Sequence, residues 1–219
     1  SKSLDIHDQD SRYKFASWTS QVLFEGSEDD GGYSATLDVS DVDGDGDFDV
    51  VTNKASDIYY LINDGVGNFS PHFVISVGDF SDNNIGYLKS IDFNGDGTSD
   101  LALSSGIDDG IRLISLDSDY NEISKQDIPH VFYNGRTEIE FADLDNDLDL
   151  DMVTGGFVKS YLNQNNLFEL NQNVMATIES PDLDSLGSND GLESPNNILL
   201  VDINEDGNID LVSGSANSR

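Results

Sequence analysis

The sequence predicts an all-β protein built from repeated four-stranded antiparallel sheets. Three observations support this fold class: an acidic eleven-residue motif occurs four times, strand-like segments flank every copy, and the order of strands and turns after each copy is similar. The motif starts at Asp41, Asp92, Asp143 and Asp202, so the copies are 51, 51 and 59 residues apart. A period of this size is typical of proteins in which each repeat is one supersecondary unit.

Each repeat reads as four strands joined by short turns. In the first repeat, "YSATLDVS" precedes the motif, and "FDVVT", "DIYYLIN" and "FSPHFVIS" follow it, with the turn "DGVGN" between the last two. These segments are rich in the β-branched and aromatic residues that strands favour. Four such strands form one blade of a β-propeller, and the predicted blades span about residues 34–80, 85–130 and 137–178.

The two ends of the chain predict a fourth blade. Residues 196–215 contain the fourth motif with one strand on each side, whereas residues 12–26 read as two strands with no motif before them. We expect these segments to combine into a closing blade, because closure removes exposed sheet edges. Residues 1–219 would then form a single four-bladed domain. The alternatives are that the chain is part of a larger propeller, for example one with seven blades, or that two chains combine.

The motif has the composition and spacing of a calcium-binding loop. Positions 1, 5 and 9 are always Asp, position 3 is Asp or Asn, and position 6 is Gly in three of the four copies. Calcium takes six to eight oxygen ligands, and carboxylates at alternate positions reach one ion only if the chain curls around it. Glycine at position 6 permits the positive-φ turn that the curl requires. The strand-like flanks and the lack of Glu at position 12 argue against an EF-hand, whose loop joins two helices.

The predicted ligands are positions 1, 3, 5, 7 and 9 of the four loops, with position 7 acting through its backbone carbonyl. They are Asp41, Asp43, Asp45, Asp47, Asp49, Asp92, Asn94, Asp96, Thr98, Asp100, Asp143, Asp145, Asp147, Asp149, Asp151, Asp202, Asn204, Asp206, Asn208 and Asp210. The pattern resembles the FG-GAP and VCBS calcium-loop repeats of integrin α-subunit propellers, fungal propeller lectins and bacterial surface proteins, over about residues 12–215. The resemblance implies a calcium-binding β-propeller with about one Ca²⁺ per repeat, up to four. Leu148 replaces glycine at position 6 of the third loop, so we expect that loop to be distorted or weaker.

The charge of the chain restricts its partners and its environment. The formal net charge is −33, from 43 acidic and 10 basic residues, so the surface repels nucleic acid and anionic lipid and attracts cations. No apolar run approaches the ~18 residues needed to cross a bilayer, and the chain has no cysteine for disulfide or thiol chemistry. Loops of this kind fill with calcium near millimolar concentrations, and salt screens a large negative charge. We therefore predict an extracellular or cell-surface protein, from a marine or other high-salt environment.

The sequence contains no recognisable catalytic constellation, so we predict a binding or adhesion module and not an enzyme. The three histidines lie outside zinc-site motifs, and no G-x-S-x-G sequence occurs. The calcium loops should lie at one end of the blades and the crossovers between blades at the other. We expect the crossover face to bind a glycan or protein through Tyr33, Phe80, Tyr87, Tyr133 and Arg136. The alternatives are a propeller domain of a polysaccharide-degrading enzyme and a structural spacer in a large surface adhesin or filament.

Overall fold

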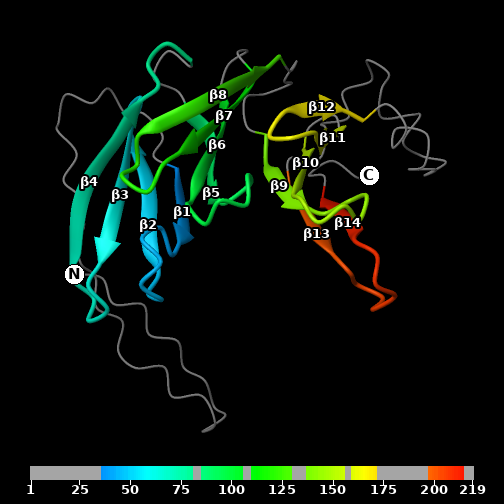
Figure 1. Cartoon of the computed structure of the whole chain (residues 1–219), viewed down its shortest axis with the longest axis horizontal. Helices are drawn as coiled ribbons and strands as arrows, with labels where there is room; N and C mark the ends of the chain where they lie inside the picture. The colour runs from blue at the N-terminus through cyan, green and yellow to red at the C-terminus, as the bar shows by residue number, and fades with distance from the viewer. Residues whose placement is uncertain are drawn as a thin grey trace, which may run out of the picture.

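A computed structural model describes residues 36–80, 85–105, 110–129, 137–155, 159–171 and 197–214. These residues form three four-stranded sheets and one two-stranded sheet, which follow one another from blue to red in Figure 1. The strands of the first sheet are β1 (Leu37–Ser40), β2 (Asp49–Lys54), β3 (Asp57–Asn63) and β4 (Phe69–Ser76). Those of the second sheet are β5 (Ile85–Ile91), β6 (Asp100–Ser105), β7 (Ile111–Leu116) and β8 (Glu122–Ile128). Those of the third sheet are β9 (Ile139–Ala142), β10 (Asp151–Thr154), β11 (Lys159–Asn163) and β12 (Phe168–Leu170). The last, two-stranded sheet consists of β13 (Asn197–Val201) and β14 (Asp210–Gly214).

Strands that are consecutive in the chain are neighbours in every sheet, so each sheet is an antiparallel meander. The predicted fold class, an all-β protein with four-stranded antiparallel sheets, is therefore confirmed. The described residues contain no helix. In that part of the chain, accordingly, no helix is long and apolar enough to span a membrane.

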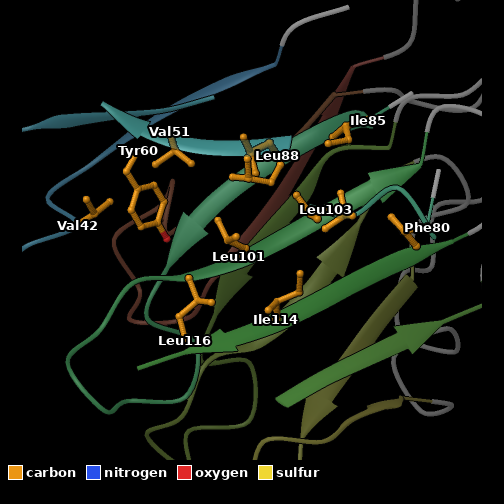
Figure 2. Close-up of a cluster of buried hydrophobic side chains, with 12 residues drawn as sticks. Val42, Val51, Tyr60, Phe80, Ile85, Leu88, Leu101, Leu103, Ile114 and Leu116 are labelled. Carbon is orange, nitrogen blue, oxygen red and sulfur yellow. The ribbon is translucent and has the colours of Figure 1, made fainter. Parts of the chain in front are cut away.

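Each sheet has two faces, because side chains alternate along a strand. We call the face toward the next sheet in the chain the leading face, and the opposite one the trailing face. On the leading face of the first sheet, Val51 and Tyr60 are paired across β2 and β3 and are fully buried. They pack in one apolar cluster with Leu88, Leu101 and Leu103 of the second sheet (Figure 2). This cluster is the contact between the leading face of the first sheet and the trailing face of the second.

The next contact repeats this arrangement. Ala102 and Leu113 of the second sheet lie in a second buried cluster with Ile139, Met152 and Tyr161 of the third sheet. Within this cluster, three phenylalanine rings have centroids 5.6–6.1 Å apart. Two of these pairs are edge-to-face, a geometry that adds to the gain from burial. The rings belong to Phe93, Phe141 and Phe168.

Polar contacts also join the sheets along their first strands. In β1, Asp38 Oδ2 accepts a hydrogen bond of 2.8 Å from the backbone N–H of Ser90 in β5. Just before β9, Glu138 Oε2 accepts one of 2.6 Å from the backbone N–H of Ile198 in β13. Between them, Lys89 Nζ lies 2.9 Å from Glu140 Oε2. Because these bonds involve charged groups, they are stronger than neutral hydrogen bonds and add to the apolar contacts between neighbouring sheets.

The described strands make an arc in which sheets contact one another in chain order. β1 packs on β5, β6 on β9, and β9 on β13. At the start of the arc, Leu37 and Val39 on the trailing face of the first sheet are exposed. Closure into a four-bladed ring stays a prediction, and residues 12–26, which would complete the closing blade, lie outside the described residues.

Candidate metal centre

The four acidic loops join the first two strands of each sheet and turn through a left-handed backbone at the same two positions. Positions 4 and 6 have positive φ in every loop: Gly44 76°, Gly46 95°, Gly95 75°, Gly97 88°, Asn146 63°, Leu148 77°, Glu205 60° and Gly207 89°. The sequence predicted the requirement at position 6. It also carried a signal for position 4, which is Gly, Gly and Asn in the first three loops, but that signal was missed.

Leu148 adopts the same backbone conformation as the glycines at the equivalent position, so the third loop is not distorted there. The left-handed conformation costs an L-residue about 1–2 kcal/mol. Its side chain is 93% exposed and therefore contributes little packing to offset that cost.

The aspartate at position 1 holds the curl of each loop. Its Oδ2 atom accepts a hydrogen bond from the backbone N–H of position 6, at 3.0, 2.8, 3.1 and 2.8 Å in chain order. The aspartate at position 5 stabilises the following turn of the loop, because its Oδ1 accepts the backbone N–H of position 7 in all four loops. Such bonds from Asp to backbone two residues away stabilise turns. The positive φ at position 6 thus turns an N–H back toward the first carboxylate.

The aspartate at position 9 ties the loop to the third strand of its sheet. Asp49 Oδ2 accepts the N–H of Val42 at 2.9 Å, and its Oδ1 accepts the N–H of Asn63, the last residue of β3, at 2.8 Å. Asp151 makes the same two bonds in the third sheet, to Leu144 and Asn163 at 2.8 Å each. Both carboxylates are fully buried, so their oxygens are fixed in direction.

Two asparagines that the sequence analysis missed support this anchor. The side-chain amide of Asn63 donates to the carbonyl of Phe48 at 3.1 Å, and that of Asn163 donates to the carbonyl of Leu150 at 3.3 Å. Both carbonyls belong to position 8 of the adjoining loop. The third strand ends in "LIN" in the first repeat and in "YLN" in the third repeat. This shared final asparagine was the signal in the sequence for the contact.

Two loops bring three carboxylates together. The carboxylate oxygens of positions 1, 3 and 9 lie within 4.8 Å of one another in the first and third loops, as Asp41, Asp43 and Asp49 and as Asp143, Asp145 and Asp151. This distance is about twice a calcium–oxygen bond of ~2.4 Å, so one ion can contact all three residues. Of the predicted ligands in these loops, position 5 is not part of either group.

The electrostatics of the loops fit a bound cation. Burial raises the pKa of Asp100 to about 7, and burial followed by hydrogen bonding to and repulsion from Asp147 raises the pKa of Asp149 to about 6. The pKa of Asp43 is also raised, first by burial and then by the neighbouring acidic groups. In the described structure, Asp100 Oδ2 and Asp149 Oδ1 are buried without a hydrogen-bond partner of standard geometry. A nearby divalent cation would offset both the repulsion and the missing contacts.

The second and fourth loops have an amide in place of one carboxylate. Asn94 and Asn204 occupy position 3, and their Oδ1 atoms accept the N–H of position 5 at 2.9 Å, as Asp43 Oδ1 does in the first loop at 3.2 Å. An amide oxygen is also a calcium ligand, and these loops keep aspartate at positions 1, 5 and 9. Their donor sets therefore suit calcium with one negative charge fewer.

The structure describes two of the five residues predicted for ligand binding, Phe80 and Tyr87. Tyr33, Tyr133 and Arg136 lie outside the described residues. Phe80 is buried, and the Arg112 guanidinium lies 4.7 Å above its ring centroid, so that ring is occupied by packing. Tyr87 is partly buried against the second apolar cluster.

At the crossover end, the Arg112 side chain joins the first two sheets. It makes a bidentate pair with Asp127 at 2.7 and 2.8 Å, and it contacts Asp79 at 2.7 Å. Asp79 belongs to the segment after β4 and Asp127 lies near the end of β8, so one guanidinium holds a crossover against the neighbouring sheet. Both carboxylates remain largely exposed.

Comparison with known proteins agrees with the repeat and with the fold. Residues 41–103 match the model of the FG-GAP-like repeat, from the first acidic loop into β6. No curated protein matches the chain.

Three solved structures are similar to the chain. An Agrocybe aegerita lectin, described for specific recognition of non-reducing terminal N-acetylglucosamine, has a TM-score of 0.57 and 18% identity, over 82% of this chain and 46% of that chain. The V. cholerae biofilm matrix protein Bap1 has a TM-score of 0.44 and 19% identity, over 82% of this chain and 27% of that chain. The Photorhabdus luminescens Tc holotoxin pore has a TM-score of 0.40 and 16% identity, over 55% of this chain and 6% of that chain. The chain thus spans less than half the length of each, and the likeness to the lectin shows a shared β-propeller-like fold.

Proposed function

We propose that the chain is a calcium-stabilised recognition module of an extracellular or cell-surface protein. In this proposal each acidic loop holds one Ca²⁺ through the oxygens of positions 1, 3 and 9, with positions 5 and 7 completing the set. The observation that carries it is the convergence of Asp41, Asp43 and Asp49, repeated by the equivalent residues of the third loop. The positive charge of the ion offsets the repulsion among the carboxylates. The ion also connects the two strands that flank the loop and, through the aspartate at position 9, the third strand of the sheet.

The ligand of the module is a glycan or a protein, and it binds on the crossover face opposite the calcium loops. The shared fold with a lectin supports this assignment. A sugar site needs an aromatic face and a few polar partners. Tyr33, Tyr133 and Arg136 provide these groups in the crossover sequences. The exposed carboxylates of Asp79 and Asp127, oriented by Arg112, are suitable acceptors for sugar hydroxyls.

A glycan array tests the ligand class. The labelled full chain is applied in millimolar calcium and again in EDTA, to glycans that include terminal N-acetylglucosamine. Hits are then titrated by calorimetry with wild type and with Tyr133→Ala, Arg136→Ala and Asp79→Asn. Val66→Asp serves as control, because Val66 is exposed in the turn between β3 and β4, beside the calcium loops.

We expect calcium-dependent binding that is weakened by the crossover variants and retained by Val66→Asp. Loss of binding in Val66→Asp alone, with fold and calcium content intact, would show that the ligand binds on the calcium-loop face and not on the crossover face. Turnover of acidic polysaccharides by the chain would instead identify an enzyme domain. Silence in both assays would favour a spacer in a larger adhesin.

A further inference from the structure

The internal repeats show what covers each face of a blade. On the trailing face, the residue four places before each loop is Leu37, Leu88, Ile139 and Ile198 in the successive sheets. Their exposed fractions are 69%, 2%, 0% and 5%. The last three are buried because a preceding sheet packs against them. Leu37 occupies the same position and is exposed. Within the described residues, therefore, no sheet covers the trailing face of the first sheet.

The leading face of the last sheet shows the converse. Position 11 of the loop motif is Val51, Ala102, Val153 and Val212, with exposed fractions of 0%, 0%, 5% and 40%. Val212 pairs with Leu199 across β13 and β14, and Leu199 is also exposed. Among the described strands, the arc therefore ends in two apolar faces without a neighbouring sheet, one trailing and one leading, and these are the two kinds of face that meet at every internal contact.

We propose that a second copy of this chain covers both faces. The leading face of the last sheet of each copy packs on the trailing face of the first sheet of the other copy. The pairing is head-to-tail and occurs twice, so it closes into a two-fold ring and does not continue as a filament. The contact reproduces the apolar packing that already joins the first and second sheets inside one chain (Figure 2).

Two quantities favour a second copy as the occupant. Each copy contributes three four-stranded sheets and one two-stranded sheet, so two copies place eight sheets around the ring, within the four to eight blades usual for propellers. The chain also covers 46% of the lectin chain that shares its fold, so two copies provide about the length of that chain. The net charge of −33 opposes association, and salt should therefore strengthen the dimer by screening that repulsion.

Light scattering of the full chain in calcium, at rising salt, measures the oligomeric state directly. We expect twice the 23.9 kDa mass of one chain. Leu37→Asp and Val212→Asp each place a charged side chain in both contacts between the two copies and should give monomers. The control Val66→Asp should remain dimeric. A mixture of Leu37→Asp with Val212→Asp retains one intact contact per ring and should recover dimer. A monomeric wild type, or dimers unaffected by both variants, would overturn the proposal.

Engineered cysteines distinguish a second copy from closure within one chain. The chain has no native cysteine, so Val39→Cys combined with Leu199→Cys introduces the only pair. The equivalent residues at the first internal contact are Ser90 and Asp38, which are hydrogen-bonded at 2.8 Å. We expect oxidation to give disulfide-linked dimers on non-reducing gels, with far-UV circular dichroism unchanged. Loss of thiols at the mass of one chain would show that its own two ends meet, and would contradict the second-copy contact.

Discussion

Replacing Asp49 by alanine separates the structural role of the position-9 carboxylate from its proposed role as a calcium ligand. The buried carboxylate accepts the backbone N–H groups of Val42 and Asn63 at 2.9 and 2.8 Å. Each buried N–H left without an acceptor costs about 1–3 kcal/mol. Asn63 is only partly buried and can recover a water contact, so we expect a loss of about 2–4 kcal/mol in the free energy of unfolding without calcium.

In calcium the loss should be larger, because the variant also forfeits the stabilisation by the ion. A ligand at one hundred times its Kd stabilises the native state by about 2.7 kcal/mol. The assay is urea unfolding followed by circular dichroism, in EDTA and in millimolar calcium. Asp119→Asn, an exposed aspartate in the turn between β7 and β8, is the control and should change neither value. An Asp49→Ala penalty that is the same in EDTA and in calcium would refute the ligand role, and no penalty in EDTA would refute the anchoring role.

Other substitutions test the loop backbone and the crossover clamp. Leu148→Gly should stabilise the protein by about 0.5–1 kcal/mol, because relief of left-handed strain exceeds the entropy that glycine adds to the unfolded chain. Gly97→Ala should destabilise the second loop by a similar amount, and urea unfolding in calcium measures both; a stability gain in Gly97→Ala would contradict the argument. Arg112→Met should cost about 1–2 kcal/mol, since it loses charged hydrogen bonds to Asp79 and Asp127 whose carboxylates regain water. Arg112→Lys should not restore the loss, because an ammonium cannot form the bidentate pair; full rescue by lysine would show that only the charge matters.

The fold class was predictable because its signals are local and repeated. Four copies of one acidic motif with strand-like flanks indicated β-sheet units, and the loop spacing indicated a turn at position 6. The left-handed φ of Gly46 follows from the steric freedom of glycine alone. The same reasoning predicted a distorted or weaker third loop. The distortion is absent, because Leu148 adopts the left-handed conformation and its N–H donates to the Asp143 carboxylate. Weaker calcium binding by this loop stays a prediction.

The remaining features depend on contacts between distant residues. Asn163 supports the third loop through the carbonyl of Leu150, a contact that becomes evident only when β11 lies beside β10. Phe80 reads from sequence as an exposed crossover aromatic, but its ring packs under Arg112 from the next sheet. The convergence of positions 1, 3 and 9 was expected from calcium chemistry, whereas the bonds from position 9 to the third strand required the pairing of three strands.

The number of calcium ions bound by the full chain tests the central claim most directly. Isothermal titration with calcium, after removal of metal with EDTA, should give saturable binding of up to four ions per chain. The double variant Asp41→Ala and Asp43→Ala should bind one ion fewer, and the melting temperature of the wild type should rise with calcium. A chain that binds no calcium in this titration, and melts at the same temperature in EDTA and in calcium, would contradict the account.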